Sequence, residues 1–174
     1  KGYADAKLEE IAAEANLTRG ALYHHFAGKA ELYNTLVAQA SSCIMPVIEE
    51  AMRRGGRSVE LLQRLLVATL IFVVDDPIYR AVNELVLFKT ELSHDLAAGM
   101  EMKQAGTRQI VEFLAGIIQS GMDAGELRPD LNARTAAIGL LSYQNGLILS
   151  WLLDPALFSL KDEAPMLVAQ ALQG

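Results

Sequence analysis

The chain has 174 residues, which suits one large domain or a small domain joined to a larger one. Hydrophobic residues make up 52% of it and the mean hydropathy is +0.22, so the composition allows a large core, a buried subunit interface or an apolar cavity. The formal net charge of -6 excludes a protein that coats nucleic acid generally, but not a small DNA-reading face, because local potential steers binding.

Cysteine content and apolar runs bound the cellular location. Cys43 is the chain's one cysteine, which excludes an internal disulfide and a cysteine-built zinc site and favours the reducing cytoplasm. We find no signal peptide, and the apolar run at 65–74 is too short to span a bilayer. The stretch 136–153 is nearly apolar, but Gln144 and Asn145 lie near its middle. We therefore interpret it as a buried helix and not as a membrane span.

The spacing of apolar residues is helical throughout, and no segment alternates as a strand does, so we expect an all-α fold. A first helix is expected from about residue 8 to 15. Thr18 should cap a second by accepting a hydrogen bond from the backbone N–H near Ala21. Gly28 should open a third, running to about Arg53. The inward-facing residues of the first two helices are expected to be Ile11, Leu17, Leu22 and Phe26.

Glycine and proline mark the later boundaries. The stretch 54–56 (Arg-Gly-Gly) interrupts the pattern, and Ser58 is expected to cap a helix over about 59–74. Asp76-Pro77 indicates a new helix, because aspartate suits the N-cap and proline the first helical position. Asn132 is the expected cap of a late helix. The remaining helices are expected at about 77–96, 101–122, 133–153 and 161–172.

The two short helices over about residues 7–26 have the spacing of a helix-turn-helix, which lays its second helix in the DNA major groove. Residues 15–30 contain no carboxylate, so a polyanion should approach this surface freely. Arg19 can donate to guanine O6 and N7, Thr18 can hold a phosphate, and Gly20 lets the backbone come close. Tyr23, His24 and Lys29 are candidate phosphate contacts. Spacing alone also fits a helical hairpin without DNA function.

Specific residues extend this pattern. They are Gly2-Tyr3, Leu8-x-x-Ile11-Ala12, Ala15-x-Leu17-Thr18-Arg19-Gly20-Ala21-Leu22-Tyr23-x-His25-Phe26 and Lys29-x-x-Leu32. Together they resemble the DNA-binding module of the TetR family. The resemblance implies an all-α homodimeric repressor, a further helix upstream of Lys1, and a second module at the neighbouring groove of a pseudo-palindromic operator. Where the family usually has Thr or Ser, this chain has Ala6 and Lys7, and Lys7 is the candidate replacement for that phosphate contact.

A second set of residues lies between about 60 and 165. It comprises Asn83-Glu84-Leu85, Phe88-Lys89-Thr90-Glu91, Asp130-Leu131-x-x-Arg134-x-Ala136-Ala137-Ile138, Gly146-Leu147, Trp151-Leu152, Pro155 and Phe158-x-Leu160-Lys161-x-Glu163-Ala164. This set resembles the C-terminal domain of AcrR-type multidrug-efflux repressors. We therefore expect a DNA-binding domain at 1–36 and a ligand-binding and dimerisation domain at 37–174. The resemblance implies a repressor that controls a drug-efflux or transporter operon and that leaves the DNA when it binds a bulky apolar or aromatic ligand. The alternative is a biosynthetic or catabolic operon sensing its own intermediate.

The same resemblance suggests ligand contacts. Asn83 aligns with a ligand-contacting position, while Leu87 and Ser41 stand where relatives can carry polar or acidic pocket residues. Those two changes favour neutral or anionic aromatic ligands over cationic dyes. Candidate pocket walls, each of which also fits plain core packing, are Ile71, Val74, Phe88, Ile110, Phe113, Leu114 and Trp151. Tyr143, Gln144 and Asn145 interrupt an apolar helix and bond either a ligand or a partner chain.

The helices at about 101–122 and 133–153 are expected to form a four-helix homodimer interface, where glycines would allow close approach. The glycines are Gly106, Gly116, Gly121, Gly139 and Gly146. We find no nucleophile–base set, no phosphate-binding glycine loop and no metal-ligand spacing, and we interpret His94 as a surface residue. An enzyme, a cofactor, a metal and a membrane partner are therefore not expected. The expected partners are double-stranded operator DNA, a small effector and a second copy of the chain.

Overall fold

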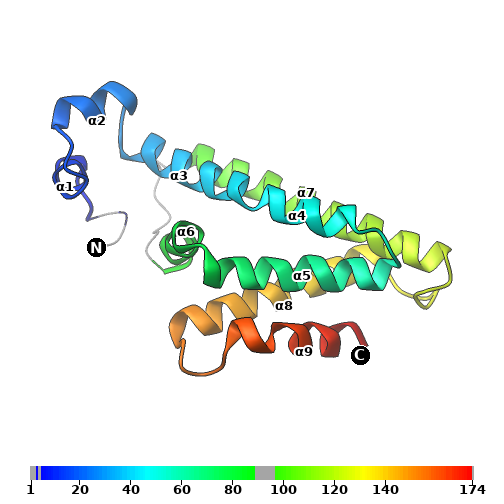
Figure 1. Ribbon diagram of the computed structural model, residues 1–174. Coiled ribbons are helices and arrows are strands. Elements are labelled where there is room, and N and C mark those ends of the chain that lie inside the picture. The colour runs from blue at the N-terminus through cyan, green and yellow to red at the C-terminus, as the bar shows by residue number, and fades with distance from the viewer. Residues whose placement is uncertain (1–2, 4, 89–96, 174) are drawn as a thin grey trace. The chain divides into compact units, whose positions relative to one another are not determined.

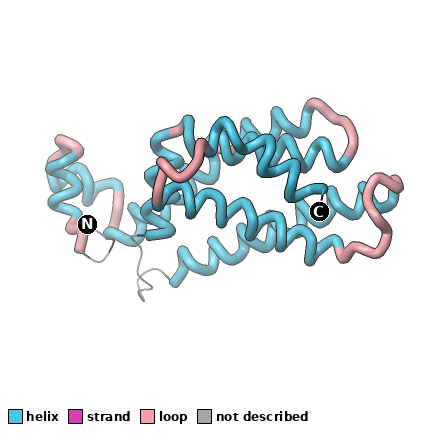
Figure 2. Tube along the Cα trace, turned by 90° about the horizontal axis from the view of Figure 1, so that it is seen from below, coloured by secondary structure: helices cyan, strands magenta, loops and turns pink. Residues whose placement is uncertain are grey.

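The computed structural model describes residues 3, 5–88 and 97–173, and every regular element within them is an α-helix (Figures 1 and 2). This confirms the expected all-α fold. The chain forms two compact units. The first contains Lys1–Cys43 and Ile78–Lys103, and the second contains Ile44–Pro77 and Gln104–Gly174.

The first unit is built on a small helix-turn-helix core. Its helices are α1 (Leu8–Glu14), α2 (Arg19–His25), α3 (Lys29–Cys43) and most of α6 (Pro77–Phe88). Helix α1 packs on α2 through buried Leu8, Ala12 and Leu22. Leu17 is 49% exposed, so its expected inward position is wrong. Leu17 directly follows the tight turn at Asn16, whose φ of 56° lies in the left-handed region.

The second unit is a packed helical bundle. Its helices are α4 (Met45–Arg53), α5 (Ser58–Asp75), α7 (Ala97–Asp123, from residue 104), α8 (Ala133–Leu153) and α9 (Leu160–Gln173). Helix α5 packs against α4, α8 and α9, and Figure 1 shows α5, α8 and α9 running side by side. Fully buried Leu70, Val73 and Val168 lie in this core.

Two expected helix boundaries are wrong. The third helix divides, because α3 ends at Cys43 and α4 begins at Met45 with Pro46 in its first turn. Proline lacks the backbone N–H that a continuous helix needs, so it favours a new start. Ser58 is the first residue of α5 and not its cap. Its backbone N–H donates to Glu126 Oε2 at 2.6 Å, a tertiary contact 68 residues away in the chain.

Other boundaries are confirmed. Thr18 caps α2, Asn132 Oδ1 caps α8 by accepting from the Thr135 N–H at 2.9 Å, and α6 begins at Pro77. Helix α6 is described to Phe88. The expected continuation over 89–96, with His94, lies outside the described residues.

Helix α8 differs from the expected buried helix. Its mean hydropathy of 1.3 and its 21 residues would suit a membrane span by length and composition, a test that core helices of soluble proteins also pass. Only 22% of an apolar 18-residue window of α8 is buried within the chain. Gln144, Ile148 and Trp151 face the bundle, whereas Leu149 and Leu153 are exposed. One face of α8 therefore packs on the chain's own core and the other does not.

Candidate nucleic-acid interface

The start of α2 is exposed and carries Thr18, Arg19 and Gly20. Thr18 Oγ1 accepts a hydrogen bond from the Ala21 backbone N–H at 3.1 Å, which fixes the first turn. The Arg19 side chain is 70% exposed. A Cβ added at Gly20 would meet no atom within 4 Å. Because nothing in the fold requires glycine there, the open space at Gly20 is available to an approaching molecule.

A carboxylate lies against this turn, contrary to the expected acid-free surface. Glu9 Oε1 on α1 is 3.2 Å from Arg19 Nη2 and accepts a hydrogen bond from the Tyr23 hydroxyl at 3.3 Å. The Arg19 guanidinium carbon lies 5.2 Å from the centre of the Tyr23 ring. Residues 15–30 are free of acids along the sequence but not in space, because the packing of α1 on α2 brings Glu9 across.

The contacts of Glu9 favour its ionised form. Its pKa lies below the ordinary value of 4.5, chiefly because its carboxylate accepts a backbone hydrogen bond at its own residue. Desolvation, the next largest effect, raises the pKa, whereas the charge of Arg19, the Tyr23 hydroxyl and the charge of Lys7 each lower it further. Glu9 is therefore a fixed negative charge beside Arg19 at neutral pH.

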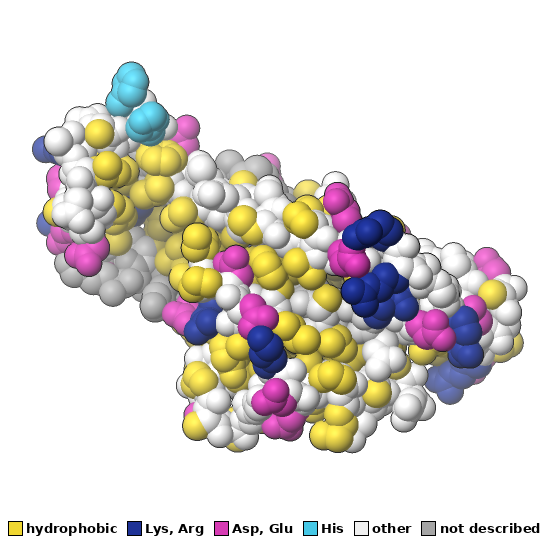
Figure 3. All heavy atoms as spheres, viewed as in Figure 1, with side chains coloured by type: hydrophobic (Ala, Val, Ile, Leu, Met, Phe, Trp, Pro, Cys, Tyr) yellow, Lys and Arg dark blue, Asp and Glu magenta, His cyan; other side chains and the backbone are white. Residues whose placement is uncertain are grey.

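The end of α2 carries two exposed histidines. The rings of His24 and His25 lie edge to face with centroids 5.4 Å apart, and they protrude from the surface in Figure 3. Tyr23, one position earlier, is 42% exposed. His24 and Tyr23 are thus accessible to an external partner, as expected from the sequence.

The two lysines differ in their surroundings. Lys7 is exposed and stands at the N-cap of α1, which has no side-chain cap hydrogen bond. Helix α1 therefore lacks the side-chain cap that a Thr or Ser at this position would supply. Lys29 Nζ donates to the Tyr3 carbonyl oxygen at 2.5 Å and lies 4.5 Å from the centre of the Tyr3 ring. Lys29 thus links Tyr3 to the start of α3.

The expected ligand residues are divided between the two units. Asn83, Leu87 and Phe88 belong to α6 in the first unit, where the Asn83 amide donates to the Tyr79 carbonyl oxygen at 2.8 Å. Leu87 and Phe88 are 43% and 40% exposed. The others belong to the second unit: Ile71 and Val74 are half-buried, Leu114 and Trp151 are buried, and Ile110 and Phe113 are exposed.

Tyr143 has a defined partner within its own unit. Its hydroxyl donates to the Leu167 carbonyl oxygen on α9 at 3.0 Å. This contact joins α8 to α9 and satisfies the Tyr143 hydroxyl without a ligand or a second chain. Of the three polar residues that interrupt the apolar helix, Gln144 is buried and Asn145 is exposed.

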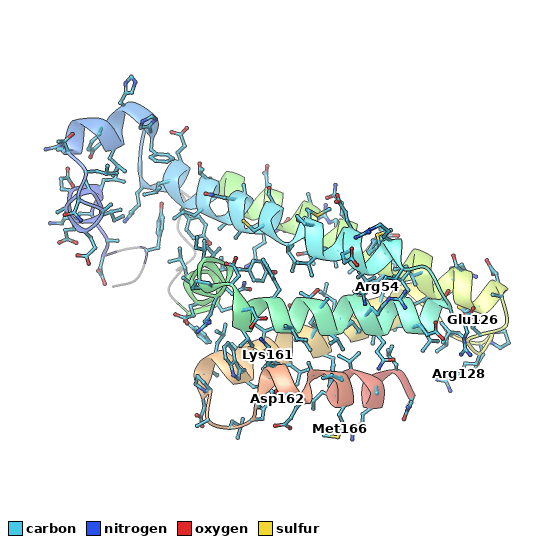
Figure 4. All side chains as sticks on the ribbon, in the orientation of Figure 1. Arg54, Glu126, Arg128, Lys161, Asp162 and Met166 are labelled. Carbon is cyan, nitrogen blue, oxygen red and sulfur yellow. The ribbon has the colours of Figure 1, made fainter. Side chains whose placement is uncertain are left out.

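The second unit contains a cavity of about 630 Å³, a size typical of ligand pockets. It lies where the start of α5, the end of α7, the start of α8 and the end of α9 meet, and Glu126 and Arg128 on the α7–α8 loop border it (Figure 4). Leu62, Ile118 and Leu140 form apolar walls. Tyr143 is its one member among the expected ligand residues, because the lining comes from separate segments that no local pattern links.

Similarity to known proteins identifies the family of this chain. Residues 1–36 match the bacterial regulatory proteins of the tetR family, and residues 58–174 match the C-terminal region of MAATS-type transcriptional repressors. The chain belongs to the TetR family. TetR-family proteins are DNA-binding transcription regulators, so this chain is a regulator and not an enzyme.

Relatives of this TetR-family chain include repressors of drug efflux. The HTH-type transcriptional regulator AcrR of Shigella flexneri is 29% identical over 99% of this chain and 81% of its own length. NalD of Pseudomonas aeruginosa, the secondary repressor of the MexAB-OprM multidrug efflux pump, has a TM-score of 0.85 at 26% identity, covering 100% of this chain and 87% of NalD. SmeT of Stenotrophomonas maltophilia, solved with triclosan, has a TM-score of 0.79 at 25% identity, covering 98% and 82%.

The part of the TetR-family chain that the structure describes holds no group of three or more His, Cys, Asp or Glu side chains placed to bind a metal ion.

Proposed function

We propose that this TetR-family chain is a cytoplasmic, ligand-responsive repressor that binds a pseudo-palindromic operator as a dimer. It controls a drug-efflux or transporter operon and is released by a bulky apolar or aromatic ligand. The exposed first turn of α2 carries the proposal. There Arg19 is 70% exposed and lies between Thr18, which caps the helix, and Gly20, beside which the space is open. These residues belong to the segment that matches a DNA-binding family.

The DNA contacts follow from the chemistry of each side chain. Arg19 donates to the O6 and N7 atoms of a guanine, which is the commonest specific contact in the major groove. Thr18 and Tyr23 hold phosphate oxygens, and the open space at Gly20 lets the DNA backbone approach. Lys7, His24 and Lys29 add contacts that carry affinity and not sequence information, and these weaken as salt rises.

Dimerisation uses the exposed faces of α7 and α8. Ile110 and Phe113 on α7 are 47% and 39% exposed, and on α8 Ile138 is 41% exposed. Exposed apolar side chains gathered on one surface favour a protein interface. A Cβ at Gly116, Gly139 or Gly146 would meet no atom of the chain within 4 Å, so these glycines leave room for a second helix. Gly121 serves the chain's own packing, because a Cβ there would lie 2.9 Å from Leu127 Cδ1.

The ligand is an apolar or aromatic molecule that is neutral or anionic. Relatives that repress efflux pumps, and the complex of SmeT with triclosan, support this class. Leu87 and Ser41 bring no negative charge to attract a cation. The exposed Leu87 and Phe88 side chains on α6, with the Asn83 amide nearby in sequence, are the proposed first contacts.

A mobility-shift titration with the promoter of the protein's own gene tests this function. We expect a discrete complex that survives a large excess of unrelated DNA, and we expect triclosan, as an aromatic probe, to release it. The control is a promoter fragment of the same length and composition with scrambled sequence. Equal affinity for both fragments would contradict operator recognition. Release by a metabolic intermediate and not by triclosan would favour a biosynthetic or catabolic operon.

A further inference from the structure

Arg19 and Tyr23, two of the proposed DNA-contacting residues, share one oxygen atom of their own chain. Arg19 Nη2 lies 3.2 Å from Glu9 Oε1, and the Tyr23 hydroxyl donates to that same Oε1 at 3.3 Å. The guanidinium also lies against the Tyr23 ring, at 5.2 Å from its centre. The three side chains thus form one cluster, the Glu9 cluster, on the exposed surface of α1 and α2.

The geometry leaves Arg19 tethered but able to donate elsewhere. An arginine side chain has five N–H donors, and the ion pair with Glu9 joins one terminal nitrogen to one carboxylate oxygen. The side chain is 70% exposed, so the remaining donors face solvent. Arg19 can therefore approach a guanine edge while Glu9 restricts the positions its long side chain adopts.

The charge of Glu9 acts against DNA of any sequence. A carboxylate beside the groove-facing arginine repels phosphates, and it offsets the arginine's attraction for a phosphate placed anywhere along the duplex. A correctly placed guanine compensates through two directed hydrogen bonds, whereas a randomly placed phosphate does not. The same carboxylate thus lowers non-specific affinity more than operator affinity.

We propose that Glu9 is a positioning residue that sets the sequence specificity of Arg19. It holds Arg19 for base recognition, with the Tyr23 hydroxyl bound to the same carboxylate oxygen, and suppresses the binding of Arg19 to random phosphates. This inference rests on the proposed contact between Arg19 and DNA. It differs from that contact because Glu9 touches no DNA and acts through its two partners.

The test compares Glu9→Gln with Glu14→Gln. Glutamine keeps the size of the side chain and removes its charge. Glu14 lies five residues further along the same helix and supplies the matched loss of one negative charge. Operator and scrambled DNA are titrated with the full chain at several salt concentrations. Circular dichroism and thermal unfolding establish that each variant is folded.

We expect Glu9→Gln to raise affinity for scrambled DNA roughly two- to fivefold, the range of an exposed ion pair, and to raise operator affinity less. The slope of log affinity against log salt concentration for scrambled DNA should steepen by about one phosphate contact, because Arg19 becomes free to neutralise one more phosphate. Glu14→Gln should leave the ratio of operator to scrambled affinity unchanged. With Arg19→Ala as the background, Glu9→Gln should no longer alter that ratio.

Three results would overturn the inference, and they are distinguishable. If Glu9→Gln and Glu14→Gln change both affinities equally, Glu9 acts only as general charge, while the DNA contact of Arg19 stands. If Arg19→Ala alone leaves the ratio unchanged, the contact of Arg19 with operator bases fails and the role of Glu9 fails with it. Persistence of the Glu9→Gln effect on the ratio in the Arg19→Ala background would also exclude action through Arg19.

Discussion

At the scale of single residues, Thr18 fixes where α2 begins. Its hydroxyl accepts the Ala21 N–H at 3.1 Å. We expect Thr18→Ala to lower the free energy of unfolding by about 1 kcal/mol, the usual cost of losing an N-cap, and to weaken operator binding. Thr18→Ser keeps the hydroxyl and is the control. Urea unfolding measures both variants, and equal destabilisation by Ala and Ser would contradict the capping role.

Glu9 should make stability depend on pH. Its pKa is lowered in the folded chain, chiefly by its own backbone hydrogen bond and then by Arg19. The folded state therefore binds the proton less tightly than the unfolded state, and the stabilisation is present above the unfolded pKa, near 4.5, and lost as pH falls through the folded value.

Thermal unfolding of wild type and Glu9→Gln, from pH 7 down through the pKa of Glu9, checks the direction of this pH dependence. Wild type should be the more stable at pH 7, by a small margin because Glu9 is exposed, and the margin should vanish as the pH falls through the lowered pKa of Glu9. A margin that grows as pH falls would contradict the assignment.

The residues also show what local pattern can predict. Thr18 and Asn132 as caps follow from short-range chemistry, because each side chain bonds a backbone N–H three residues away. Glu9 beside Arg19 was not predictable in this way. Its position depends on how α1 crosses α2, and the sequence shows only an acid-free window.

At the scale of elements, α8 has two different faces. Trp151 and Ile148 pack into the chain's own core, while Ile138 and Leu149 are 41% and 37% exposed. The nearly unbroken apolar sequence of α8 predicted burial but not which surface buries it. We propose that a second copy of the chain covers this exposed face.

Ile138→Glu should therefore separate the dimer, because it places a charge in an apolar interface. Sedimentation at fixed concentration should then report a monomer. Met166 on α9 is 56% exposed and provides the control, since Met166→Glu adds the same charge outside the proposed interface (Figure 4). A dimer that survives Ile138→Glu, or that is lost equally in Met166→Glu, would contradict the use of α8.

At the scale of the whole molecule, the helical spacing of apolar residues predicted the all-α fold, and the resemblance of the first 32 residues to the TetR family predicted the family. The cavity of about 630 Å³ was not predicted, because its walls come from four helices and the α7–α8 loop and no single helix carries its signature. Release from DNA requires two states of the chain and a ligand that binds one more tightly than the other. The proposed contacts on α6 are where that difference should be sought.

The central claim is that α2 reads DNA sequence through Arg19. The most direct measurement is the ratio of operator to scrambled-DNA affinity at one fixed salt concentration for wild type, Arg19→Ala and Arg128→Ala. Arg128, exposed in the second unit, controls for the loss of one arginine charge. We predict that Arg19→Ala lowers discrimination by roughly 1–3 kcal/mol and that Arg128→Ala leaves it unchanged. An unchanged ratio in Arg19→Ala would contradict the claim.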